Sequence, residues 1–355
     1  MDRIIEAGKL RACMERIFEK EGFTPAQAQT VADVLMQADL FGIESHGAQR
    51  LMYYHRNIRS GSVDVHAAAE VLRETPVSAL IDGHFGMGAL VGVFAMNKAI
   101  EKAKQTGVGM VAVRNSSHYG IAGYYTLMAE REGLAAFSMT NTGPIMVPTF
   151  GREMMLGTNP LAFCMPASPY PFWFDASTTV VTLGKVEVYG KRGKPMPEGW
   201  TIDAEGQPCV DAARANAGIL RGDRGGILPL GGAGELTGGH KGYGLGVMVE
   251  ALTGVLAQGM TSPEMCGAHG DHTCHFFLAF DPAMFGDPEE IRSRMSLYLE
   301  RLRESEKAPG CGRIFTAGEK AFEAMETRLR LGIPVEEKTL GEVRLIAREL
   351  GVACI

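Results

Sequence analysis

The stretch that decides the fold is Val108-Gly109-Met110-Val111-Ala112-Val113-Arg114-Asn115-Ser116-Ser117-His118. Its first half is a short apolar run rich in valine, typical of a buried β-strand, and its second half is polar. Helical patterns flank it at residues 89–105 and 119–131, and further short strands are expected at 77–81 and 134–139. Strands that alternate with helices predict an α/β core, with a polar loop at the end of a buried strand.

The residues before this core are expected to be helical. Thr24-Pro25-Ala26-Gln27 is a capping box with proline at the first helical position, so a helix should run from here to about Leu40. An apolar repeat at residues 10–18 predicts an earlier helix, and Ser45 is a candidate N-cap for a later helix that runs to Arg59.

The second half of the chain is less regular. Turn signals dominate after residue 140 and lead to a glycine-rich run at 231–239. We expect a helix at 240–258, a strand at 275–281 and a largely helical remainder.

The order of these segments suggests two regions. Residues 1–75 and 318–355 are expected to form a helical region, and residues 76–317 an α/β core whose strand-end loops could bind ligands. A smaller subdomain near 190–260 could split that core. A length of 355 residues, with 46% hydrophobic and 21% charged residues, is ordinary for a globular protein of this size.

Composition also argues against several classes of function. A formal charge of -6 without a basic cluster gives no field for nucleic acid. The acidic start is unlike a signal peptide, and no apolar run reaches the roughly 18 residues of a membrane span, so we expect a cytoplasmic protein. Seven cysteines, an odd number spread over a long chain, suggest reduced thiols rather than a disulfide framework.

The first candidate site lies at the start of the expected third helix. On a helix that begins at Ser45, the side chains of His46, Arg50, Tyr53 and Tyr54 would share one face. Arginine offers a bidentate fork to a carboxylate, and histidine can move a proton near neutral pH. The alternative is an N-capping serine followed by a solvated polar face.

The second candidate site is the polar loop Asn115-Ser116-Ser117-His118-Tyr119-Gly120. A loop between a strand end and a helix start supplies backbone amides for an anion, and His118 is placed to act as an acid or base. The alternative is that His118 caps the helix or satisfies a buried polar group.

The glycine-rich loops do not form a dinucleotide fingerprint. Gly86 and Gly88 match the first two glycines of G-x-G-x-x-G, but the next glycine is Gly92, one position late. We therefore do not expect a Rossmann domain. The turn Gly157-Thr158-Asn159-Pro160 carries two polar side chains. In His240-Lys241-Gly242, a flexible loop feeds a helix start, where Lys241 could meet a phosphate or ribose.

A cysteine- and histidine-rich segment raises the question of a metal. It contains Cys266, His269, His272, Cys274 and His275. The spacing fits no standard zinc motif, and alternation along the expected strand would point Cys274 and His275 to opposite faces. We therefore expect no metal site.

Taken together, several segments of the chain resemble the malate/L-lactate dehydrogenase family, which also contains sulfolactate and ureidoglycolate dehydrogenases. The resemblance spans nearly the whole chain. It rests on Glu44 to Arg50, Asn115 to Tyr125, Gly157 to Phe163, Phe174 to Thr178, Pro197 to Trp200, His240 to Leu245 and Phe276 to Pro282.

The resemblance implies an α/β, non-Rossmann fold with a mixed sheet and helical terminal regions, a homodimer, and NAD or NADP as cofactor. It implies substrate contacts from Arg50, Tyr54 and Thr158. The implied cofactor contacts are His118, Tyr119, Gly120, Ile121, Ala122, Thr142, Asp175, Ala176, Ser177, Thr178, Lys241, Gly318 and Glu319. The family's usual Pro-Gly-Glu is Ala317-Gly318-Glu319 here, which puts the last contact in doubt.

The activity expected on this basis is hydride transfer that interconverts a small 2-hydroxy acid and its 2-oxo acid. His118 is the first choice for the acid/base and His46 the second, with Ser45 orienting His46. Two alternatives remain: a reductase of a cyclic 2-imino acid, and a metal-binding protein without enzymatic activity. The sequence does not identify the substrate or choose between NAD and NADP.

Overall fold

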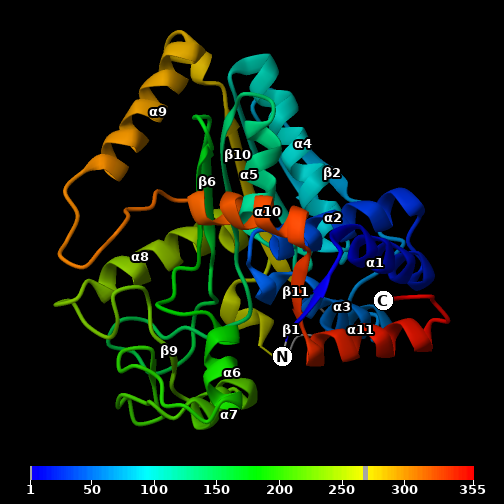
Figure 1. Cartoon of the computed structure of the whole chain (residues 1–355), viewed down its shortest axis with the longest axis vertical. Coiled ribbons are helices and arrows are strands. Elements are labelled where there is room, and N and C mark those ends of the chain that lie inside the picture. The colour runs from blue at the N-terminus through cyan, green and yellow to red at the C-terminus, as the bar shows by residue number, and fades with distance from the viewer. Residues whose placement is uncertain (1, 267–270) are drawn as a thin grey trace.

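The computed structural model describes residues 2–266 and 271–355, and its centre is a seven-stranded sheet (Figure 1). The strand order is β2-β3-β4-β10-β5-β6-β7. These strands are β2 (Glu70–Glu74), β3 (Ser78–Asp82), β4 (Val108–Ser116), β5 (Ala135–Thr140), β6 (Leu161–Met165), β7 (Phe172–Ala176) and β10 (Thr273–Phe280).

The sheet is mixed. Among the described residues only β3 and β4 pair in parallel, because α4 (Gly88–Thr106) connects them as a crossover; the other neighbours are antiparallel. This confirms the expected α/β, non-Rossmann fold. Helices α4 and α5 (Ala122–Glu130) cover one face, and α8 (Gly239–Glu250) with the π-helical η3 (Ala251–Val255) covers part of the other.

The two ends of the chain lie together beside this sheet (Figure 1). β1 (Asp2–Ile5) pairs with β11 (Ile333–Glu336), and the surrounding helices are α1 (Ala7–Glu21), α2 (Pro25–Leu40), α3 (Leu51–Arg59), α10 (Glu319–Leu331) and α11 (Glu337–Glu349). The expected capping box is present: the Thr24 side chain accepts from the Gln27 backbone, and the Gln27 side chain accepts from the Thr24 backbone.

The stretch expected to be loop-rich contains helices that the sequence analysis missed. α6 (Leu183–Lys191) and α7 (Ala212–Arg221) pack with the short strands β8 (Thr201–Ile202) and β9 (Gly226–Ile227), at the bottom of Figure 1. Their apolar cluster is separate from the main core. The remaining elements are η4 (Ser262–Met265), η5 (Pro282–Met284) and α9 (Pro288–Glu304), which extends at the upper left of the figure.

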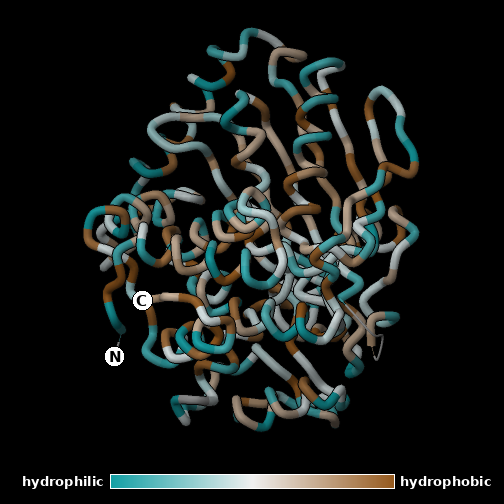
Figure 2. The backbone as a smooth tube through the Cα atoms, turned by 90° about the vertical axis from the view of Figure 1, so that its right-hand side faces the viewer, coloured by the Kyte–Doolittle hydropathy of each residue, from teal (hydrophilic) through white to brown (hydrophobic). Residues whose placement is uncertain are grey.

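Hydropathy along the backbone follows this architecture. Figure 2 shows hydrophobic and hydrophilic segments alternating around the helices, as expected where one face of each helix packs on a core. Within the described residues, no helix combines the length and the apolar character needed to cross a membrane.

The helix expected from Ser45 is interrupted, so that part of the prediction was wrong. Two short 3₁₀ turns, η1 (Glu44–His46) and η2 (Ala48–Arg50), precede α3. The break is at Gly47, where any Cβ would collide with the buried carboxylate of Asp39. That carboxylate accepts the backbone N–H of Ala48 at 2.8 Å, so it sets the path of the loop.

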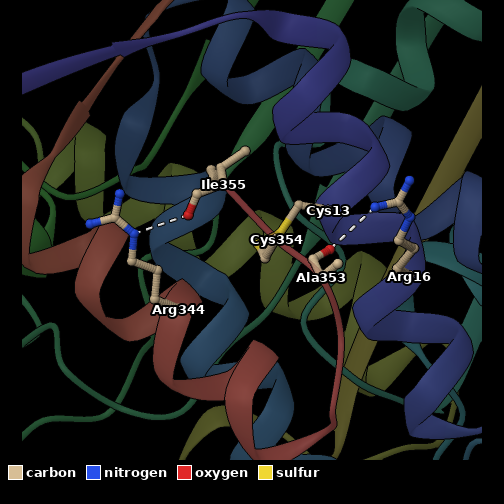
Figure 3. Close-up of a disulfide and its surroundings, with 6 residues drawn as sticks. All are labelled: Cys13, Arg16, Arg344, Ala353, Cys354 and Ile355. Atoms are coloured by element: carbon tan, nitrogen blue, oxygen red, sulfur yellow. Dashed lines mark hydrogen bonds between the residues drawn. A yellow bond between two sulfur atoms is a disulfide. The ribbon is translucent and has the colours of Figure 1, made fainter.

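One pair of cysteines departs from the expectation of reduced thiols, because Cys13 and Cys354 form a disulfide (Figure 3). Their Cα atoms lie 5.1 Å apart although 341 residues separate them in sequence, a pairing that no local spacing could reveal. The tail is also held by hydrogen bonds from Arg16 to Ala353 and from Arg344 to Ile355. Of the free cysteines, Cys164, Cys209 and Cys274 are buried, and Cys266 and Cys311 are exposed.

Candidate active site

Two segments that the sequence analysis singled out meet in space. The imidazoles of His46, on η1, and His118, after β4, stack with ring centroids 5.5 Å apart. Tyr53 and Tyr54 of α3 flank His118, with centroids at 5.9 and 5.7 Å. The expected cluster of imidazoles and phenols is therefore present, although the helix expected to carry it is broken at Gly47.

Hydrogen bonds at Nδ1 define the state of the His118 ring. The backbone N–H of Gly120 donates to Nδ1 at 3.3 Å, and the Tyr54 hydroxyl lies 2.8 Å from the same atom. A nitrogen that accepts a backbone N–H carries no proton, so the neutral ring holds its proton on Nε2. Among the described residues Nε2 has no partner, which leaves an N–H group directed at the site.

His46 is held differently. Its Nδ1 lies 2.8 Å from the hydroxyl of Ser45, and the hydroxyl oxygen can accept a hydrogen bond from an Nδ1–H group. Its Nε2 can then be unprotonated and basic.

Arg50 lies beside this imidazole pair. Its Nε donates to the carbonyl oxygen of Ser45 at 2.6 Å, and its two Nη groups form no hydrogen bond or ion pair within the described residues. The guanidinium fork is thus anchored at one side and open at the other, which suits a carboxylate.

Burial and charge keep both imidazoles neutral. Burial, and then the positive charge of Arg50, lower the pKa of His46 to about 4. Burial also holds the pKa of His118 well below its ordinary value, helped by His46, Arg50 and His275. The titration near 6.5 that an ordinary histidine would show is therefore expected at lower pH.

A carboxylate to which the sequence analysis assigned no role, Asp271 within the cysteine- and histidine-rich segment, reaches this site. Asp271 accepts the Tyr53 hydroxyl and the backbone N–H of His118, each at 3.0 Å. Its contact partners are 153 or more residues away in sequence, so only the fold reveals this role.

Three of the predicted threonines converge at the ends of neighbouring strands. The hydroxyl of Thr142 accepts the backbone N–H of Thr158 at 3.1 Å, and the backbone and hydroxyl of Thr178 donate to the carbonyl of Thr158 at 2.9 and 3.1 Å. Ser177 next to them is bonded to Thr179, at 3.0 Å between the two hydroxyls.

The expected cofactor loop lies at the start of α5. Residues 117–121 connect β4 to this helix, which begins at Ala122, and Tyr119 is buried with its ring stacked on His275 at 4.3 Å. The next amide, Gly123 N–H, donates to Asp175 at 2.8 Å, just before Ala176 at the end of β7. The loop and the β7 end are therefore together.

The remaining predicted cofactor contacts are Gly318, Glu319 and Lys241. Gly318 packs against Trp173 of β7, whose indole donates to the Gly123 carbonyl at 2.9 Å, so this turn lies near the same loop. The Glu319 carboxylate already pairs with Arg313 and accepts the Thr316 N–H at 3.0 Å. Lys241 is exposed on the first turn of α8, and its side chain makes no hydrogen bond within the described residues.

The residues at the start of α5 fit a nicotinamide cofactor. Asp175 is enclosed, its pKa is raised by burial to about 6, and only one of its oxygens has a hydrogen-bond partner among the described residues. Ribose hydroxyls could donate to the other oxygen. In the first turn of α5 the Gly123 amide is already used by Asp175, so the fit to the cofactor rests on this carboxylate and not on an open helix N-terminus.

The cysteine- and histidine-rich segment is used for other purposes. His275 bonds Thr140 and Ser116 at 2.8 Å each, and buried Cys274 lies 3.7 Å from the Met260 carbonyl. His269 lies outside the described residues. Within the described residues no three metal-ligating side chains gather.

Comparison with known proteins agrees with this geometry. The family model for malate/L-lactate dehydrogenase matches residues 5–344. A malate dehydrogenase from Pyrococcus abyssi is 47% identical over 98% of this chain and 95% of that protein, and an L-sulfolactate dehydrogenase from Methanocaldococcus jannaschii is 34% identical over 95% and 94%. The structure of a malate dehydrogenase from Pyrococcus horikoshii OT3 matches with a TM-score of 0.91, 43% identity and coverage of 100% and 97%.

The similarity to these dehydrogenases over nearly the whole chain shows an oxidoreductase of 2-hydroxy and 2-oxo acids. The chain belongs to the malate/L-lactate dehydrogenase family.

Proposed function

We propose that the protein uses NAD or NADP to interconvert a small 2-hydroxy acid of the malate, lactate or sulfolactate type and its 2-oxo acid. The observation that carries this proposal is the stacked pair His46 and His118 next to the open guanidinium of Arg50. A nicotinamide held at the start of α5 beside Asp175 would supply the hydride acceptor for C2 of the hydroxy acid. The protein supplies the carboxylate clamp and the proton acceptor.

The hydrogen bonds favour a division of roles that reverses the order of choice from sequence. Arg50 binds the substrate carboxylate. His46 accepts the hydroxyl proton at Nε2, oriented by Ser45 at Nδ1. His118 donates its Nε2–H to the C2 oxygen, because its Nδ1 is already an acceptor. Both imidazoles are neutral at neutral pH, as these roles require.

Substrate binding should make His46 a stronger base. The positive charge of Arg50 lowers the pKa of His46, and a bound carboxylate neutralises that charge. The pKa of His46 should therefore rise in the complex, toward the range in which proton transfer is efficient.

The direct test is oxidation of malate, lactate and sulfolactate with each cofactor, followed by absorbance of the reduced nicotinamide. Reduction of oxo acids and of a cyclic 2-imino acid completes the panel and separates a dehydrogenase from an imine reductase. Arg50→Lys should lower kcat/KM for every hydroxy acid while cofactor affinity changes little, because a point charge replaces a bidentate fork. Unchanged kcat/KM would remove Arg50 from the clamp.

We also propose that the functional unit is a homodimer. One row of apolar side chains crosses the face of the sheet that α8 and η3 cover only in part: Met110, Leu278, Phe137, Phe163 and Phe174 are cross-strand neighbours on β4, β10, β5, β6 and β7. Phe174 is 39% exposed, and the others are only partly buried. Such a continuous apolar surface is typical of a protein interface.

Sedimentation can test this association. Phe137→Lys should shift the protein to monomer, and Leu220→Lys, at an exposed leucine on α7, should not. A monomeric wild type, or a dimeric Phe137→Lys variant, would contradict the assignment.

We propose a cytoplasmic location. The Cys13–Cys354 bond is the observation that argues against it, because cytosolic reductants keep most thiols reduced. Thiol alkylation in intact cells, followed by mass spectrometry, would show whether the bond forms there.

A further inference from the structure

The carboxylate of Asp271 ties two walls of the site together. One oxygen, Oδ2, accepts both the Tyr53 hydroxyl and the His118 backbone N–H, each at 3.0 Å. The two donors come from different elements, α3 and the loop after β4, and Asp271 itself precedes β10. A single atom thus joins three segments at the site.

These bonds constrain the imidazole of His118. The Tyr53 ring meets it edge-on, with an interplanar angle of 79°. The side chain of Asn57, one turn further along α3, also forms a hydrogen bond with the Tyr53 hydroxyl, so Asp271 and Asn57 together determine where this ring lies. The backbone bond fixes the residue that carries the imidazole. Tyr54 contacts the imidazole directly, at Nδ1, and needs no such link.

We propose that Asp271 is a positioning residue for hydride transfer: it holds the His118 backbone and the Tyr53 ring so that the His118 imidazole presents Nε2 to the C2 oxygen. This inference rests on the function proposed above. Asp271 need not touch the substrate to act. Small errors in the placement of a catalytic group are costly, since a displacement of about 1 Å can lower the rate roughly 100-fold.

The geometry predicts which replacements can substitute for Asp271. Both donors use the same oxygen, so the amide oxygen of asparagine can accept both bonds without a negative charge. Alanine can accept neither. A role in positioning therefore predicts that Asp271→Asn retains turnover and that Asp271→Ala does not, whereas a role through charge predicts equal losses.

The experiment measures kcat, KM and the deuterium isotope effect with C2-deuterated hydroxy acid. For Asp271→Ala we expect kcat to fall about 10- to 100-fold and the isotope effect to rise, because a misplaced donor slows the chemical step. Asp271→Asn should stay within about threefold of wild type. Glu264→Ala is the control. It removes an exposed side chain that caps η4 earlier in the same segment, and kcat and the isotope effect should stay unchanged.

A double-mutant cycle with Tyr53→Phe provides an independent measurement. If Asp271 acts partly through this hydroxyl, Tyr53→Phe should lower kcat in wild type and have much less effect in Asp271→Ala. Should Asp271→Ala not fold, Asp271→Leu, which is close in size and accepts no hydrogen bond, takes its place in the same cycle, and an equal effect of Tyr53→Phe in both backgrounds would contradict the coupling.

Wild-type kcat and isotope effect in Asp271→Ala would overturn the positioning role alone, and so would equal losses in Asp271→Ala and Asp271→Asn. A wild-type protein that is inactive toward the whole substrate panel would overturn the proposed function and this role together.

Discussion

Two kinds of histidine lie close together at the end of β4, and they differ in what their nitrogens contact. His275 is fully buried, and both ring nitrogens are bonded, to Thr140 and to Ser116. His46 and His118 each have a bonded Nδ1 and an Nε2 without a partner among the described residues. Burial lowers the pKa in all three. A perturbed pKa therefore does not distinguish a histidine that reacts from one that supports the fold; an unused nitrogen does.

The largest effect should follow from His46→Asn. Without the proton acceptor, kcat for hydroxy acid oxidation should fall by about 1000-fold, within the range for loss of general base catalysis, while cofactor affinity is kept. In the wild type, kcat/KM should decline at low pH around the lowered pKa of about 4. This decline, the acid limb of the pH profile, should vanish in the variant. If the limb persists in this variant and vanishes in His118→Asn, the roles of the two imidazoles are exchanged.

The next largest effect is expected from removing the positive charge of Arg50, which lies beside the imidazoles of His46 and His118. Arg50→Gln should lower kcat/KM roughly 100-fold, since a charge-assisted contact to the carboxylate is lost. It should also move the acid limb to higher pH, because the charge that lowers the pKa of His46 is gone. Arg50→Lys keeps the charge and should leave the limb in place. A limb at the same pH in both variants would show that Arg50 does not control this titration.

A smaller loss is expected for His118→Asn. The asparagine amide retains an N–H donor, so kcat should fall about 10-fold if His118 only donates a hydrogen bond to the C2 oxygen. Thermal unfolding serves as the control and should change little. A loss as large as that of His46→Asn would show that His118 transfers the proton itself.

The smallest effect on turnover is expected for His275→Asn, which should leave kcat per folded molecule unchanged but lower stability. The folded pKa of His275 is about 3, below the ordinary 6.5, so the folded state binds fewer protons between these values. Wild-type stability is then full above pH 6.5 and declines as pH falls, by at most about 1.4 kcal/mol per unit from this group.

Denaturant titrations at several pH values would measure this contribution. The difference in free energy of unfolding between wild type and His275→Asn should narrow as pH falls. His66→Asn, at an exposed histidine, should unfold with the same free energy as wild type. A difference in unfolding free energy that does not change with pH, or a loss of kcat, would contradict the assignment of His275 as a histidine that supports the fold.

The parts of the fold that sequence could predict were those with a local pattern. The apolar runs at 108–113, 134–139 and 275–281 became β4, β5 and β10, with ends shifted by a few residues. The order of these strands could not be predicted, because β10 inserts between β4 and β5 although it is far from both in sequence. The edge strand β2 was missed because its residues are mostly exposed and charged.

The site shows the same limit. Ser45, His46, Arg50 and His118 were predicted from residue types and spacing. The convergence of both segments depends on long-range contacts, and so does the role of Asp271. The protonation state of His118 depends on one backbone bond from Gly120, which sequence cannot indicate.

The contact between Asp39 and Gly47 also limits how this loop can change over evolution. Gly47 has a negative φ of -97°, outside the left-handed region, and a Cβ at this position would collide with the neighbouring carboxylate of Asp39. Position 47 is therefore closed to substitution for as long as position 39 is aspartate. A lineage could place alanine at 47 only after shortening residue 39, and would then have to replace the bond to Ala48 that guides His46 and Arg50. The two positions should vary together or not at all.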